Sequence, residues 1–254
     1  MSNQDATVSN AQPGNGSRIR VFDALRGLCV LSMIAFHFCY DLVYLRGVEV
    51  TWFYPPFVDI WRASISWVFL ALAGVMCSFS RNNLKRAAKY GLVALAVWAA
   101  TTIAAVDDSI SFGIIFCMAA STLVYALLQK LNAAPKGFFA AFVLFAAFLL
   151  AMGLPNGHLS LPGYTLEIPK TLYSTEWLSW LGFPGPKFVS GDYYPLLPYG
   201  LMYLAGASLG PWLKQNLPSR VRSLGFAPLE FIGRHTLEVY IAHQPLLLLV
   251  LGLI

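Results

Sequence analysis

The sequence predicts an all-α fold, a polytopic transmembrane helical bundle of about seven spans. Of its 254 residues, 57% are hydrophobic and only 11% are charged, whereas an ordinary globular chain has about 25% charged residues. Several apolar runs reach the roughly 20 residues that a helix needs to cross a hydrocarbon core about 30 Å thick. These runs lack the alternating pattern of a β-barrel, and unpaired backbone groups are costly in lipid, so helices are expected.

Seven apolar runs are the candidate spans. They cover residues 22–43, 63–80, 87–106, 112–131, 137–153, 195–213 and 231–254. The polar stretch before them, residues 1–17, is rich in Asn, Ser, Gly and Gln and predicts a disordered tail. The remainder, residues 18–254, is expected to form a single domain, because most connections between the runs are short.

The distribution of Lys and Arg predicts the orientation of the spans, since cytoplasmic connections carry an excess of both. If the N-terminus is cytoplasmic, the inner segments hold eleven basic residues: Arg18, Arg20, Arg81, Lys85, Arg86, Lys89, Lys130, Lys136, Lys214, Arg220 and Arg222. The outer segments then hold four, Arg46, Arg62, Lys170 and Lys187. We therefore expect an inner N-terminus and an outer C-terminus. This asymmetry accounts for the net charge of +5 without nucleic acid as a partner.

The long connection 154–194 is expected on the outer side. Five prolines interrupt any long helix there, and the segment keeps several aromatic residues, Tyr164, Tyr173, Trp177 and Trp180. Two interpretations stay open for these aromatics: they rest at headgroup level, or the segment forms a lid over a pocket that faces outward.

No metal or disulfide is expected. The four cysteines, Cys29, Cys39, Cys77 and Cys117, all fall within candidate spans and form no Cys-x-x-Cys pair. A disulfide framework or a zinc site would show closer or more exposed pairs.

The first apolar run is the most informative segment, because it holds four ionisable residues. At 100° per residue, Asp23, Arg26, His37 and Asp41 share one face of a helix. Such groups within a membrane normally face the bundle interior or a wet cavity and mark a site. A purely structural interpretation remains open, in which Asp23 and Arg26 pair at the interface and His37 is a hydrogen-bonded core residue.

Two residues of this face have the spacing of a base and its orienting carboxylate. Asp41 follows His37 at i+4, so the two side chains are neighbours on a helix. A neutral imidazole there could take a proton from a hydroxyl or amine. In the last run, Arg234 and Glu238 fall on one face and could pair, whereas His243 lies about half a turn away and is either a core residue or part of the site.

Several motifs together resemble a known family. They are Arg20-x-x-Asp23-x-Leu25-Arg26-Gly27 followed by His37 and Asp41, then Phe69 to Gly74, Phe112-Gly113-Ile114, the run from Asp192 to Pro198, and Gly233-Arg234 leading to His243-Gln244-Pro245. In this order they resemble the transmembrane acyltransferase superfamily and, more closely, bacterial relatives of the heparan-alpha-glucosaminide N-acetyltransferase catalytic domain, over roughly residues 18–250. Phe116 stands where this resemblance leads us to expect histidine in many relatives.

The resemblance implies transfer of an acyl group, usually acetyl, from cytosolic acyl-CoA to a sugar hydroxyl or amine on the far side of the membrane. It implies site residues in three groups: catalytic His37, Asp41 and His243; donor-binding Asp23, Arg26 and Arg234; and substrate-binding Asp192 and Tyr193. The expected location is a bacterial inner membrane. The expected partners are lipid, acyl-CoA and a sugar or glycan-like acceptor, and a homo-oligomer is left open.

Two other function classes compete with the acyltransferase. A proton-coupled or anion transporter would use the same ionisable face as a pathway, and would show solute uptake without acyl-CoA turnover. No internal repeat supports it. A structural or assembly protein of the membrane leaves the four ionisable residues of the first run unexplained.

Overall fold

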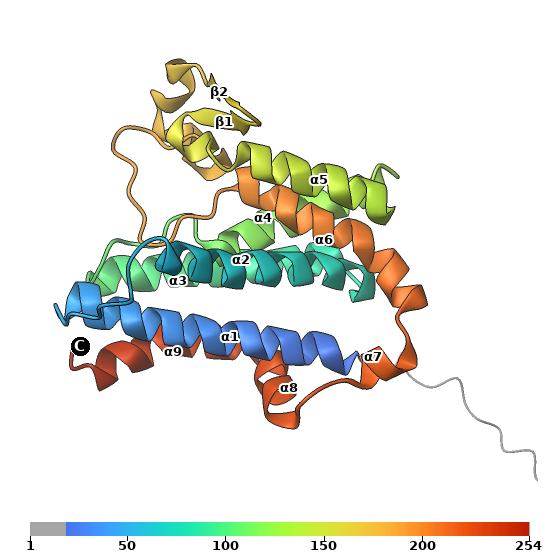
Figure 1. Ribbon diagram of the computed structural model, residues 1–254, viewed down its shortest axis with the longest axis horizontal. Helices are drawn as coiled ribbons and strands as arrows, with labels where there is room; N and C mark the ends of the chain where they lie inside the picture. The colour runs from blue at the N-terminus through green and yellow to red at the C-terminus, as the bar shows by residue number, and fades with distance from the viewer. Residues whose placement is uncertain (1–18, 254) are drawn as a thin grey trace, which may run out of the picture.

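The computed structural model describes residues 19–253, which form a bundle of helices that lie side by side (Figure 1). The structure is 70% helical with little sheet, which confirms the all-α class. The polar tail predicted at residues 1–17 lies outside the described residues, as do Arg18 and Ile254.

The first six predicted runs each coincide with one long helix. In chain order the α-helices are α1 (Arg20–Tyr40), α2 (Phe57–Val75), α3 (Asn83–Ala104), α4 (Ile114–Lys130), α5 (Gly137–Ala151), α6 (Leu196–Asn216), α7 (Ser219–Ser223), α8 (Ala227–Arg234) and α9 (Thr236–Val250). Helix α1 continues as a π-helical segment, η1 (Asp41–Leu45), and α2 continues as a 3₁₀ turn, η2 (Met76–Phe79). Most ends agree with the predicted runs within a few residues.

The seventh predicted span, 231–254, is wrong as a single helix. The structure divides it into α8 and α9 at His235, whose φ of −105° and ψ of 27° are not helical. Apolar composition does not reveal such a break, because the run contains no proline or glycine at His235 to mark it. Four helical segments are long and apolar enough to cross a membrane, Arg20–Leu45, Phe57–Phe79, Asn83–Ala104 and Gly137–Asn156, while α4 and α9 are shorter. The number of spans and their orientation stay predictions.

The connection 154–194 contains a hairpin that the sequence analysis did not predict. Strands β1 (His158–Leu161) and β2 (Tyr164–Glu167) pair antiparallel, and Gly163 turns between them with φ of +74°. Three short 3₁₀ helices, η3 (Leu154–Asn156), η4 (Lys170–Tyr173) and η5 (Glu176–Leu181), complete the segment. Strands of four residues are too short to show a reliable alternation. The hairpin projects beyond the end of α5, away from α1 and α9 (Figure 1).

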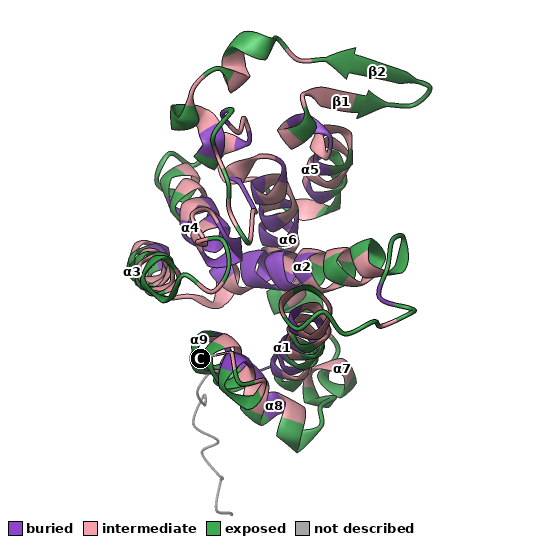
Figure 2. Ribbon diagram, turned by 90° about the vertical axis from the view of Figure 1, so that its left-hand side faces the viewer, coloured by how far each residue is buried: buried purple, intermediate pink, exposed green. Residues whose placement is uncertain are grey.

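Buried residues concentrate along α2, α4 and α6, in the middle of the bundle, as Figure 2 shows. Helices α3 and α5 present large apolar side chains outward, and Ile103 and Phe139 are 84% and 81% exposed. A protein in water rarely exposes so much contiguous apolar surface. The outward faces therefore fit a hydrocarbon solvent, in agreement with the predicted membrane location.

Glycines bring two pairs of helices into backbone contact. A Cβ built on Gly233 of α8 would lie 1.7 Å from the carbonyl oxygen of Asp23 on α1, and one on Gly27 would lie 2.0 Å from that of Leu229. Between α2 and α6, Gly74 and Gly206 are as close to the backbone of the other helix. Lipid supplies no hydrophobic force between helices, so small residues that permit close approach are what stabilise such pairs.

We expect Gly233→Ala to destabilise the protein by more than about 2 kcal/mol, because its new methyl group meets backbone that cannot move aside. The matched control is Gly91→Ala in α3, where a Cβ meets nothing within 4 Å. There the substitution should be neutral or slightly stabilising, since alanine favours helix. The measurement is the fraction of protein that stays monodisperse in detergent after heating. Equal loss in both variants would contradict the importance of the α1–α8 contact.

Candidate active site

The ionisable face predicted for the first run is present on α1 and its extension. His37 lies in the last turn of α1, and Asp41 begins the π-helical segment that continues it. Asp41 is fully buried, at 0% exposure. A carboxylate so deep in a bundle needs polar partners, because burial without them is costly.

Helix α9 supplies a second histidine to this position. The ring centroids of His37 and His243 lie 5.1 Å apart, and His243 is buried. The structure therefore places His243 beside His37 in a buried position, and its assignment to the site stays a prediction. Figure 1 shows α9 running along α1 at the end where both residues lie.

The hydrogen bonding of His243 fixes its tautomer. Its Nδ1 lies 2.5 Å from the carbonyl oxygen of Tyr240, which can only accept, so Nδ1 carries the proton. The lone pair is then on Nε2. That atom is buried and has no hydrogen-bond partner within residues 19–253. His243 thus offers a free proton acceptor in a buried position beside His37.

Asp41 has a different partner from the predicted one. Both of its carboxylate oxygens accept from Nε2 of Gln244, at 3.0 Å each. The carboxylate therefore ties α1 to α9 instead of orienting the ring of His37, and this part of the prediction needs correction. Gln244 was not predicted as a site residue, although it stands directly after His243 in the sequence, because only the tertiary fold brings it to Asp41.

The predicted donor-binding residues gather where α1 meets α8. Arg26 forms an ion pair with Asp23 on the same helix, and Nε of Arg234 donates to the carbonyl oxygen of Glu230 at 3.1 Å. The carboxylate of Glu230 in turn pairs with Arg20 at 2.8 Å. The hydrogen bond of Arg234 thus goes to the backbone of α8, not to Glu238, the suggested partner. Asp23 is buried, whereas Arg234 is exposed.

The predicted substrate-binding residues have structural partners of their own. Oδ2 of Asp192 accepts from the backbone N–H of Ile114 at 3.1 Å, which caps the first turn of α4. The hydroxyl of Tyr193 donates to the carbonyl oxygen of Ser179 at 2.6 Å. A Cβ on Gly113 would lie 2.7 Å from Oδ2 of Asp192, so glycine is required at this close approach.

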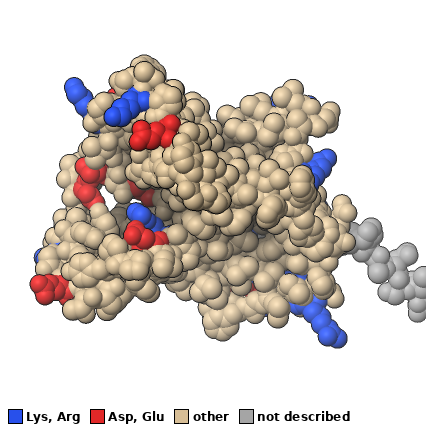
Figure 3. Space-filling model, turned by 45° about the horizontal axis from the view of Figure 1, so that its top comes forward, with Lys and Arg blue, Asp and Glu red and all other residues tan. Residues whose placement is uncertain are grey.

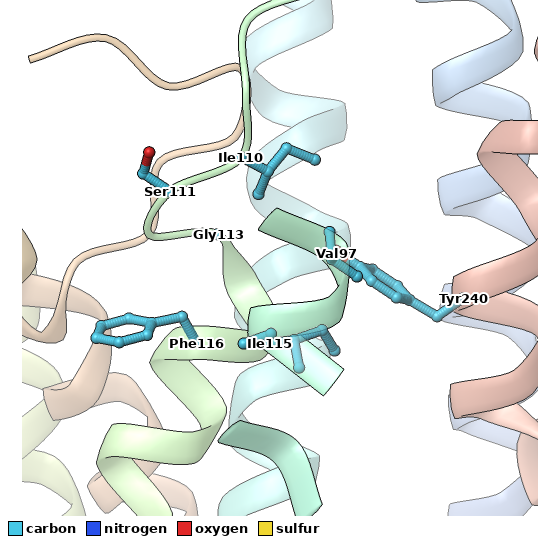
Figure 4. A pocket seen from close by; sticks show the side chains of 8 residues that line it. Val97, Ile110, Ser111, Gly113, Ile115, Phe116 and Tyr240 are labelled. Atoms are coloured by element: carbon cyan, nitrogen blue, oxygen red, sulfur yellow. The ribbon is translucent and has the colours of Figure 1, made fainter. Parts of the chain in front are cut away.

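A small cavity of about 10 Å³ lies where α3, α4 and α9 meet. Tyr240 reaches across from α9 to line it together with Val97, Gly113 and Phe116, as Figure 4 shows. On its other side Tyr240 contacts His243, with ring centroids 5.5 Å apart. Phe116, the position where histidine was expected, is thus an apolar wall of this cavity.

One end of the bundle is hollowed. Figure 3 shows acidic and basic side chains gathered around a hollow at the left-hand end of the molecule, the end at which Figure 1 places the C-terminal ends of α1 and α9. Within residues 19–253, no group of three or more His, Cys, Asp or Glu residues is arranged to hold a metal ion.

Comparison with known families identifies the family of this chain. Residues 18–245 match the family described as "Heparan-alpha-glucosaminide N-acetyltransferase, catalytic". The chain belongs to this family. Membership confirms the resemblance drawn from the motifs and implies a membrane acetyltransferase type of activity. No curated protein and no solved structure matches the chain significantly.

Asp192 lies in the connection before α6, outside the long helices, and makes the stability of the folded protein depend on pH. Burial raises the pKa of its carboxyl to about 6, although the hydrogen bond from Ile114 and the charge of Arg62 both lower it. An unfolded Asp ionises near pH 4, so between about pH 4 and 6 the folded state binds more protons than the unfolded state. Stability contributed by neutral Asp192 is therefore present below pH 4 and is lost as the pH rises to 6.

We expect Asp192→Asn to remove this dependence, because the amide oxygen still caps Ile114 but does not ionise. The thermal midpoint of the wild type, relative to that of the variant, should fall as the pH rises from 4 to 6 and then level off. Glu49→Gln, which removes an exposed carboxylate far from Asp192 in sequence, is the matched control. If the thermal midpoints of wild type and Asp192→Asn differed by the same amount at every pH in this range, burial of the carboxyl of Asp192 would not be the cause.

Proposed function

We propose that the protein transfers an acyl group, most simply acetyl, from cytosolic acyl-CoA to a hydroxyl or amine at the outer side of a bacterial cytoplasmic membrane. The observation that carries this proposal is the pair His37 and His243, with a free acceptor atom on Nε2 of His243, in a chain of an acetyltransferase family. The acceptor is expected to be a sugar or a similar molecule.

The spacing of the two ends of α1 suits the donor. An acyl-CoA carries its phosphates on the nucleotide and its thioester at the end of a long flexible arm. Arg26 precedes His37 by eleven residues, which is about 16 Å along a helix. Arginine binds phosphate with several parallel hydrogen bonds. We place the phosphates near Arg26 and Arg234, and the thioester near His37.

The proposed reaction uses one general base on the protein. His37 takes the proton from the acceptor hydroxyl or amine as its oxygen or nitrogen attacks the thioester carbonyl. The carbon–sulfur bond breaks, and the CoA thiolate leaves and takes up a proton as free CoA. His243 lies beside His37, with ring centroids 5.1 Å apart, so both rings can contact the group that receives the acyl chain. We propose a direct transfer, with donor and acceptor bound together.

Donor binding tests the inner end of the site. Arg26→Ala alone would leave Asp23 as a buried unpaired charge, so we choose the double variant Asp23→Asn/Arg26→Gln. Loss of a charged hydrogen bond should weaken acetyl-CoA binding about 10- to 100-fold, measured by calorimetry on purified protein in detergent. Arg46→Ala, an exposed arginine beyond α1 at the other end, should bind like the wild type. No binding by folded wild type would favour the transporter.

Turnover tests the reacting end. In inverted membrane vesicles the cytoplasmic face is outside, so added acetyl-CoA should be consumed when glucosamine is trapped within. His37→Ala should lower this rate at least 100-fold, the usual contribution of a general base. His235→Ala, at the break between α8 and α9, is the matched control. A His37→Ala protein that is folded and fully active would show that His37 is not the base.

A further inference from the structure

Gln244 occupies an unusual position in the site. Its Nε2 donates to both oxygens of Asp41, which is fully buried, and it links α9 to α1 one turn beyond the histidine pair. Two successive contacts thus join these segments, one between the rings of His37 and His243 and one between the side chains of Asp41 and Gln244.

The carboxylate of Asp41 fixes which way the amide of Gln244 points. A carboxylate only accepts hydrogen bonds, so the NH₂ group must face it and the carbonyl oxygen must face away. That oxygen, Oε1, is buried and has no hydrogen-bond partner within residues 19–253. Its orientation therefore follows from the pairing with Asp41.

A second buried acceptor without a partner is next to it in sequence. Nε2 of His243 is in the same condition, because Nδ1 of that ring is committed to Tyr240. Buried polar atoms nearly always have partners in native structures, and exceptions often mark places for a ligand or water. Two buried acceptors on consecutive residues of α9, one on the ring beside His37 and the other on the amide bound to Asp41, therefore indicate a ligand group that carries at least two polar hydrogens.

We propose that Gln244 contacts the acceptor substrate directly. Its Oε1 accepts one hydrogen bond from the group that receives the acyl chain, Nε2 of His243 accepts another, and Asp41 is the positioning residue that holds the amide in place. The chemical class is a molecule with two adjacent donors, such as a primary amine or a pair of neighbouring sugar hydroxyls. This inference rests on the proposed function.

The alternative is that Gln244 only ties the two helices together. The two roles differ in what they change. Loss of a purely structural link lowers stability and changes the KM for both substrates. Loss of a direct contact changes the KM for the acceptor substrate alone. Gln244→Met by itself would strand the charge of Asp41. Asp41→Asn by itself would add an NH₂ group that can donate to Oε1 of Gln244 and turn this oxygen away from the substrate. The comparison is therefore made between two double variants that both carry Asp41→Asn.

The experiment compares Asp41→Asn/Gln244→Glu with Asp41→Asn/Gln244→Met, using glucosamine as the probe because it carries an amine and hydroxyls. The first variant keeps both the link between the helices and an acceptor oxygen, whereas the second removes both. We expect the variant with Gln244→Met to have a KM for glucosamine about tenfold higher, and to bind it about tenfold more weakly, from loss of one buried hydrogen bond. The KM for acetyl-CoA should be the same in both variants.

The matched control is Gln129→Met, which removes another glutamine that hydrogen-bonds across helices, here to Asn83. It should leave both KM values as in the wild type. Equal glucosamine KM and affinity in the two Asp41→Asn proteins, both folded, would overturn the inference while the proposed function stands. Gln244-dependent binding of glucosamine without acetyl-CoA turnover would overturn the function and keep the site. A folded wild type that neither binds nor acetylates glucosamine would overturn both.

Discussion

The contact between α1 and α8 is the constraint on which the site depends. Gly27 and Gly233 let the two backbones meet so closely that neither position has room for a side chain. Helix α9 follows α8 after a single non-helical residue, His235. The direction of α9 along α1, and with it the approach of His243 to His37, is therefore set by a contact at the opposite end of α1.

Polar groups inside this bundle fall into two kinds. In most of them, the polar atoms are paired with other protein groups. Examples are the ion pair of Arg26 with Asp23 and the hydroxyl of Tyr203, which lies 3.1 Å from the thiol of Cys77 and 2.6 Å from Thr122. The second kind includes His243 and Gln244, where one atom is bound to protein and the other is left as a free acceptor. In a medium without water, the first kind stabilises the fold, and the second kind is available for a substrate.

Much of the fold follows from simple periodicity, and the site follows only in part. The apolar runs located six long helices, and the 100° rule placed His37 and Asp41 on one face because both lie on one continuous helix. The same rule failed for the last run, since the break at His235 resets the helical phase between Arg234 and His243. The partner of Asp41 was missed for another reason: an i+4 spacing makes His37 and Asp41 neighbours, but Gln244, more than 200 residues away in sequence, is the group that reaches both carboxylate oxygens.

Helix α1 carries the basic residue assigned to the donor phosphates and the histidine assigned to the reaction, so one rigid element sets the distance between them. The wider π-helical turn that begins at Asp41 lies where α1 meets α9, and such turns are often found at functional sites. Donor geometry thus depends on the straight part of α1, and acceptor geometry depends on the turn that ends it and on the helix bound to that turn.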